Sequence, residues 1–215
     1  MSSKRTAVVF VHGLWMTGRE SVFLRRRLAV DPGYDLHSFR YFSLGAPMAE
    51  HVGRLAAFLA QLDAPRVHLV GHSLGGLVIY RLMESGLIAD APRLGRVVFL
   101  GTPAVESRTG RRLGSHALGR RLLGHAACSE FLATHQRVWR FAPPLGIVAG
   151  DQPIGLGRLI SPHATPNDGT VSVAETRLPG ATEHIVLPVS HTGMWLSPRV
   201  ARVLASFLEH GHFGL

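Results

Sequence analysis

The chain has 215 residues, of which 46% are hydrophobic and 17% charged. This composition excludes a disordered chain, and the length allows a single domain, residues 1–215, with a sizeable core. The net charge of +9 comes almost entirely from arginine, because Lys4 is the only lysine. It reflects either a coding bias towards arginine or an attraction to anionic partners.

Cys128 is the only cysteine, so the chain cannot form an internal disulfide. A strand-like run begins at Ala7, shortly after Arg5, so we expect no signal peptide. The sequence contains no stretch of about 18 apolar residues, so we predict no transmembrane helix and expect a cytoplasmic protein.

Short apolar runs recur along the chain, and most are rich in Val and Ile without strict alternation, which is typical of strands buried on both faces. These predicted strands comprise residues 7–11, 36–42, 67–70, 97–100, 146–149 and 185–189. Segments with helical spacing of apolar residues lie between or after them, at 19–29, 47–62, 74–85 and 197–210. The alternation predicts an α/β protein with a doubly wound, mostly parallel sheet of about six strands.

The segment 104–141 breaks this alternation, because it is too long for one crossover helix. We predict a cap insertion within the same domain. Its seven arginines and two glutamates give a net charge of +5. Leu118 and Leu122 would share one helical face, whereas four glycines favour short helical pieces. Such a cap predicts either weak contact with an anionic membrane surface or an ordinary solvated segment.

The run Gly71-His72-Ser73-Leu74-Gly75 follows the third predicted strand and precedes an apolar helix. So short a pattern also arises by chance, and its place between strand and helix makes it informative. On such a turn the serine hydroxyl stands at the sheet edge, flanking glycines relieve crowding, and the helix N-terminus faces developing negative charge. We predict that Ser73 is a nucleophile; the alternative is a glycine-rich turn with a capping serine.

This segment resembles the nucleophile elbow of the α/β-hydrolase superfamily, in the form seen in bacterial lipases and lipase-like esterases. Other segments resemble, in the same order, the oxyanion loop (11–15), the segment after the fourth strand of lipases and inositol deacylases (99–103), the acid loop (167–171) and the histidine loop (190–193). The resemblance extends from about Val8 to His191. It implies the α/β-hydrolase fold and a lipase-like serine esterase.

His191 follows the last predicted strand and precedes the last helix, which would place it at the same sheet edge as Ser73. It is the predicted general base, unless it only caps that helix. Two aspartates compete to be its acid partner. Asp151 directly follows the fifth strand, and Asp168 lies in the segment that resembles the acid loop. We favour Asp168, which gives the chain order Ser73, Asp168, His191.

The backbone N–H groups of Leu14 and Leu74 are the predicted donors of an oxyanion hole. His12 is expected to hold the loop after the first strand through a ring hydrogen bond. Large apolar side chains flank the oxyanion and histidine loops, where they either line a substrate pocket or belong to the core. They are Trp15, Met16, Met194 and Trp195.

These residues predict a serine hydrolase that cleaves carboxylic esters through an acyl-enzyme on Ser73. A thioesterase, an amide- or inositol-deacylating hydrolase or an acyltransferase would use the same triad. A non-catalytic binding scaffold of this fold is the alternative of another class.

The sequence shows no metal-ligand cluster and no phosphate or dinucleotide loop, so we expect no metal and no cofactor. Its basic residues are not interleaved with aromatic residues, which argues against binding of nucleic acid. The expected partner is a small ester or lipid substrate, and the oligomeric state stays open.

Overall fold

The computed structural model describes residues 5–29, 33–88, 93–133, 136–155 and 166–214. Within them, six strands form one sheet in the order β2-β1-β3-β4-β5-β6, and each pairing between neighbours is parallel. The strands are β1 (Thr6–Val11), β2 (Tyr34–Phe39), β3 (Val67–His72), β4 (Leu94–Leu100), β5 (Leu145–Gly150) and β6 (Glu183–Leu187). This is the predicted doubly wound α/β fold.

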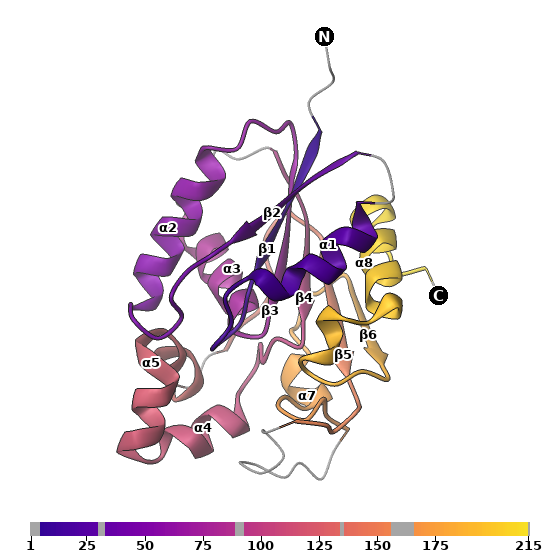
Figure 1. The fold of residues 1–215 in the computed structure, drawn as a ribbon. Coiled ribbons are helices and arrows are strands. Elements are labelled where there is room, and N and C mark those ends of the chain that lie inside the picture. Colours follow the sequence, from indigo (N-terminus) through magenta and orange to yellow (C-terminus); the bar gives the residue numbers. More distant parts are fainter. Residues whose placement is uncertain (1–4, 30–32, 89–92, 134–135, 156–165, 215) are drawn as a thin grey trace.

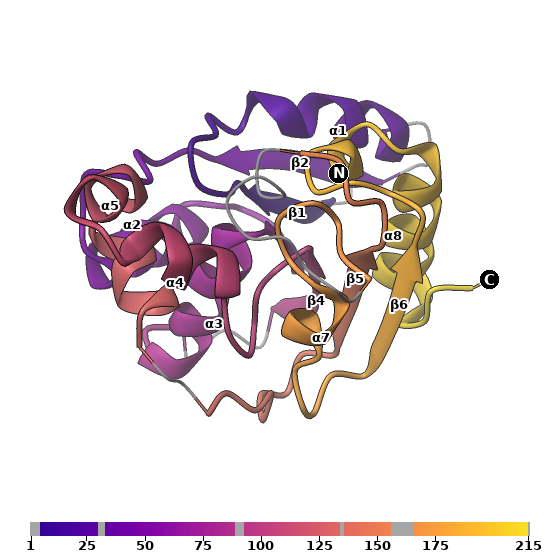
Figure 2. The ribbon, with the colours of Figure 1, turned by 90° about the horizontal axis from the view of Figure 1, so that it is seen from below.

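Helices cover both faces of the sheet (Figures 1 and 2). The helical elements are η1 (Arg19–Ser21), α1 (Val22–Leu28), α2 (Met48–Ala60), α3 (Leu74–Ser85), α4 (Arg108–Gly114), α5 (Ala117–Phe131), α7 (Val173–Thr176), η2 (Gly193–Trp195) and α8 (Pro198–His210). The apolar faces of α2 and α3 pack into one core cluster, and those of α1 and α8 pack into another on the opposite face.

The two clusters explain the unbroken apolar runs of the sequence. Along β1, Val9 faces the cluster of α2 and α3, whereas Val8 and Phe10 face the cluster of α1 and α8. Successive side chains of a strand point to opposite faces, so a strand covered on both faces needs apolar residues throughout. Every residue of β3 and β5 is buried for this reason.

Local signals set the ends of the helices. The Ser197 side chain accepts a hydrogen bond from Val200 N, and Pro198 occupies the first turn of α8. Gly86 ends α3 in the left-handed conformation that favours glycine at this position. The second predicted strand, 36–42, is shifted towards the N-terminus as β2. It ends at Phe39, because the chain then leaves the sheet and Tyr41 turns towards His12.

The segment 104–141 contains α4 and α5, which lie to one side of the carboxyl edge of the sheet (Figure 2). Gly124 has φ 73° and breaks α5 into two helical pieces. Not all charged side chains of this segment are on the surface. Glu130 and Arg137 are buried, and the Glu130 carboxylate forms ion pairs with Arg81 and Arg137. The described part of the chain holds no helix long and apolar enough to cross a membrane.

Candidate active site

Ser73 occupies the turn between β3 and α3, with φ 52° and ψ −121°. Its N–H donates to Leu100 O at 2.9 Å, which ties the turn to β4. A Cβ on Gly71 would lie 2.5 Å from Gly76 Cα, and one on Gly75 would lie 2.2 Å from Val11 O. Only glycine therefore permits this turn, and its tightness leaves the serine side chain at the carboxyl edge of the sheet.

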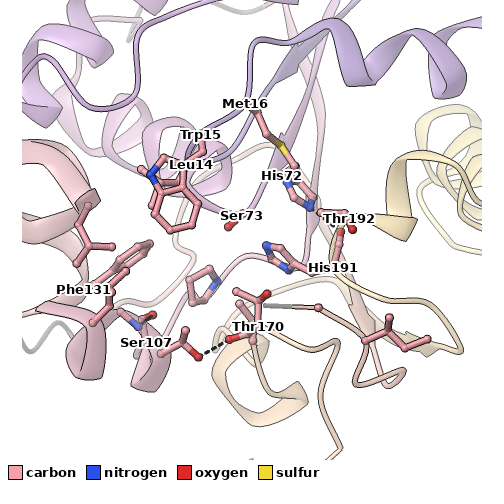
Figure 3. Close-up of a pocket in the computed structure, with 18 residues that line it drawn as sticks. Leu14, Trp15, Met16, His72, Ser73, Ser107, Phe131, Thr170, His191 and Thr192 are labelled. Carbon is pink, nitrogen blue, oxygen red and sulfur yellow. Dashed lines mark hydrogen bonds between the residues drawn. The ribbon is translucent and has the colours of Figure 1, made fainter. Parts of the chain in front are cut away.

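His191 and Asp168 form a direct hydrogen bond, from His191 Nδ1 to Asp168 Oδ2 at 2.7 Å. His191 lies in the loop after β6. The His191 backbone N–H donates to Asp168 O at 2.8 Å, so both backbone and side-chain hydrogen bonds hold the pair together. A carboxylate at Nδ1 leaves Nε2 as the ring nitrogen available for a serine hydroxyl. Figure 3 shows the His191 ring directed towards Ser73.

The Asp168 carboxylate is almost wholly buried, with 1% of the residue exposed. Its second oxygen, Oδ1, accepts hydrogen bonds from Thr170 N at 2.9 Å and Val171 N at 2.7 Å. Burying a charge is costly unless it is well bonded, and these donors together with His191 satisfy both oxygens. The Asn-Asp-Gly segment is thus both a turn and the support of an oriented acid.

Asp151, the competing acid, follows β5 as predicted, and its side chain is exposed. Its N–H donates to Leu187 O at 3.1 Å, so its backbone extends the pairing of β5 with β6. The carboxylate that contacts His191 is that of Asp168.

The loop after β1 brings Leu14 beside Ser73, and both line one cavity. A Cβ on Gly13 would lie 3.0 Å from Ser73 Cβ, so the loop approaches the serine closely. His12 Nδ1 donates to Gly13 O at 2.9 Å, and its Nε2 accepts from Tyr41 N at 3.3 Å. Burial lowers the pKa of His12, which favours the neutral ring that this bonding requires. Through these two hydrogen bonds the His12 ring joins the loop after β1 to the segment that follows β2.

His72, which directly precedes Ser73, had no assigned role in the sequence interpretation. Its Nε2 lies 2.9 Å from His191 O, and its ring centroid lies 4.6 Å from that of His191. Burial is the main reason that the pKa of His72 lies well below 6.5, and the neighbouring His191 lowers it further. A neutral His72 can donate from Nε2 and thereby fix the loop that carries His191. Its place beside the predicted nucleophile was the available signal.

A cavity of about 350 Å³ opens over these residues and is lined mainly by apolar side chains (Figure 3). Ser73 and His191 lie on one wall, and Leu113, Leu123 and Phe131 of α4 and α5 form the other. The remaining lining residues are Leu14, Trp15, Met16, His72, Pro103, Ser107, Thr109, Gly110, Ile154, Gly155, Thr170, Val171 and Thr192.

The four apolar residues considered for the substrate pocket separate into two pairs. Trp15 and Met16 line the cavity. Met194 and Trp195 are instead fully buried in the core cluster of α1 and α8, and the Trp195 ring lies 5.1 Å from that of His72. Assigning Met194 and Trp195 to the pocket is therefore corrected: η2 turns them under the histidine loop, where they support it from the core.

The leucine N–H groups predicted as oxyanion donors come from two different elements beside Ser73. Leu74 opens α3, and Leu14 follows the close approach at Gly13. Within the described residues, no group of three His, Cys, Asp or Glu side chains is placed to hold a metal ion.

Comparison with known proteins agrees with this architecture. A model described as "Alpha/beta hydrolase family" matches residues 8–205, so the chain belongs to the alpha/beta hydrolase family. No curated protein matches the sequence.

Three solved structures illustrate the similarity of fold. The mature lipase BlEst2 of Bacillus licheniformis is 21% identical, with a TM-score of 0.74 over 97% of this chain and 92% of that one. Phospholipase PlaB of Legionella pneumophila is 16% identical, with a TM-score of 0.69 over 94% of this chain and 55% of that one. The RedJ thioesterase of Streptomyces coelicolor is 15% identical, with a TM-score of 0.61 over 97% and 86%.

Proposed function

We propose that this member of the alpha/beta hydrolase family is a serine hydrolase that cleaves carboxylic esters, with Ser73, His191 and Asp168 as its triad. The observation that carries the proposal is the 2.7 Å hydrogen bond between the buried Asp168 and His191, which lines the same cavity as Ser73. Nucleophilic catalysis by serine needs a base in reach and an acid that orients the base.

In the proposed reaction, Ser73 Oγ attacks the ester carbonyl carbon while His191 Nε2 takes the hydroxyl proton. The carbonyl oxygen becomes an oxyanion, which the Leu14 and Leu74 N–H groups stabilise. His191 returns the proton to the leaving alcohol as the C–O bond breaks, and an acyl-enzyme remains on Ser73. Water, deprotonated by His191, then hydrolyses that ester and restores the serine.

The apolar lining of the cavity supports an ester with an aliphatic or aromatic acyl group as the substrate. The test is a panel of p-nitrophenyl esters of increasing acyl chain length, with a matched thioester series. Turnover of esters supports the proposal, faster turnover of thioesters favours a thioesterase, and no turnover of either by a folded protein favours a binding scaffold.

Access from an anionic lipid surface is part of the proposal. Leu118 is 71% exposed and Leu122 45%, and they lie one turn apart on the first piece of α5. Exposed arginines flank them on α4 and α5, namely Arg111, Arg112, Arg120 and Arg121. A basic surface with protruding leucines has the chemistry that binds anionic interfaces, and Trp15 and Leu123 connect this surface to the cavity.

Sedimentation with vesicles tests this part separately. We expect binding to anionic vesicles, no binding to neutral ones, and loss of binding as salt is added. Leu118→Ser should weaken binding, whereas Leu87→Ser, which changes a leucine of 61% exposure after α3, should not. Equal binding to both vesicle types, or to neither, would contradict the proposal while leaving the esterase assignment intact.

A further inference from the structure

Only two non-glycine residues of the described chain have a left-handed backbone, Trp15 with φ 60° and Ser73 with φ 52°. Bulky side chains seldom adopt this conformation, which persists only where surrounding contacts hold it. The turn between β3 and α3 accounts for Ser73. Trp15 lies outside that turn, directly after Leu14, so its conformation needs a separate cause.

Two hydrogen bonds hold Trp15 in place. Its backbone N–H donates to Ser43 Oγ at 3.1 Å, and its indole Nε1 donates to Leu122 O at 2.8 Å. Ser43 is buried, whereas Trp15 is 53% exposed. Since half of the residue remains open to solvent, these two bonds, rather than enclosure in the core, account for the fixed conformation.

The break in α5 leaves one of the two acceptors, Leu122 O, free to bond Trp15. Carbonyl groups in the last turn of a helix lack intrahelical donors, and the break at Gly124 gives Leu122 such a position. A Cβ on Gly124 would lie 2.6 Å from Leu44 Cα, so glycine lets α5 approach the segment that carries Ser43. The loop after β1 is therefore bonded to α5 and to the loop after β2 through one residue.

We propose that Trp15 is a positioning residue, which fixes the Leu14 N–H beside Ser73 by bonding its loop to Leu122 and Ser43. Figure 3 shows Leu14, Trp15 and Ser73 together at the cavity. This rests on the proposed function, in which Leu14 is an oxyanion donor. An oxyanion hole works because its donors are already in place when charge develops. Freedom at Trp15 would thus affect the transition state more than substrate binding.

Trp15→Phe removes the indole donor and keeps an aromatic ring at the cavity. Ser43→Ala removes the other bond at a residue outside the cavity lining. We expect each variant to lower kcat by about 2- to 12-fold, the effect of one hydrogen bond, with KM within about twofold of the wild-type value. Trp15→Gly, which adopts the left-handed backbone without strain, should lose at least as much, because it lacks the indole anchor.

Trp139→Phe is the matched control, because Trp139 also donates from Nε1 to a backbone carbonyl, that of Pro143, at 2.8 Å. It should lower the melting temperature and leave kcat unchanged. An unchanged kcat in Trp15→Phe or Ser43→Ala, or a rise in KM alone, would overturn the proposal and show that Trp15 only contacts substrate.

Hydrogen exchange of the unliganded protein gives a second readout that needs no activity. Peptides covering residues 12–16 should exchange faster in Trp15→Phe and Ser43→Ala than in the wild type or in Trp139→Phe. Unchanged exchange there would overturn the positioning role even in an active esterase. Faster exchange in a protein that cleaves no ester would show that the two hydrogen bonds of Trp15 fix the loop, and would reject only the proposed function.

Discussion

The cavity has two walls that are built differently. On the wall formed by the carboxyl edge of the sheet, Asp168 and His191 are buried and joined by backbone and side-chain hydrogen bonds. The other wall, α4 and α5, carries exposed leucines and arginines and is broken at Gly124. Reacting groups require fixed geometry, whereas the exposed side chains of the opposite wall can vary without disturbing them, as long as Leu122 O keeps its hydrogen bond to Trp15. In the proposed function, the first wall supplies the reacting groups, and the second contacts the substrate and the anionic surface from which the substrate would enter.

The largest effect on catalysis is expected at Ser73. It lies on the wall formed by the carboxyl edge of the sheet, which we call the ordered wall. Ser73→Ala should lower kcat for an ester by about 10⁴-fold or more, because no other group forms the acyl-enzyme. Steady-state kinetics of the purified variant measures the effect, with circular dichroism to show that it folds. Wild-type turnover in the variant would remove Ser73 from the mechanism.

The two aspartates give the next largest contrast. Asp168→Asn should lower kcat by about 10³- to 10⁴-fold, since an amide at His191 Nδ1 favours the wrong tautomer. Asp151→Asn, a change of the same kind at an exposed site, should leave kcat within about twofold. The reverse order of the two effects would make Asp151 the acid.

Substitutions of His72 test whether its hydrogen bond to His191 O positions the loop that carries His191. His72→Leu should lower kcat by about 2- to 12-fold, because it removes the ring nitrogen 2.9 Å from His191 O. His72→Gln, which keeps a donor near the position of Nε2, should recover part of that loss. Equal kcat in Leu and Gln variants would show that the hydrogen bond has no part in placing His191.

Acid should lower the stability of the fold, because His72 and His68 are buried as neutral rings. Burial lowers the pKa of His72, and it lowers that of His68 to about 4, with Arg96 and Arg66 contributing. Both values lie below the unfolded value near 6.5, so the unfolded chain binds more protons and stability falls as pH falls from 6.5 towards 4. Melting temperatures measured across this range should decrease, and less steeply in His68→Gln. A melting temperature independent of pH would contradict neutral buried rings.

Substitutions on the wall formed by α4 and α5 are expected to change binding to vesicles and to leave catalysis unaffected. Each substitution of Arg111, Arg112, Arg120 or Arg121 by Gln should weaken binding to anionic vesicles by about fivefold, and the effect should vanish at high salt. Arg202→Gln, on the exposed side of α8, is the control for loss of a charge elsewhere. The same loss of binding in the control would indicate an effect of net charge alone.

The two walls also differ in how far the sequence predicts them. Buried strands and capped helices leave local patterns, which is why the six strands and the bounds of α3 were predictable. Asp168 was favoured over Asp151 because its segment resembles the acid loop of the family, whereas chain order fits both aspartates. The bond from Trp15 to Leu122 spans 107 positions, and nothing local indicates it. The burial of Met194 and Trp195 depended likewise on the packing of distant helices, and their apolar character fitted pocket and core equally.

Covalent labelling tests the central claim most directly. A fluorophosphonate phosphonylates nucleophilic serines that are activated by a base, and the adduct resembles the tetrahedral intermediate. Mass spectrometry of the labelled, digested protein should find one phosphonyl group, on the peptide that contains Ser73, and markedly slower labelling in Asp168→Asn but not in Asp151→Asn. No adduct on the folded wild-type protein, or an adduct on another residue, would contradict the assignment of this cavity as a serine hydrolase site.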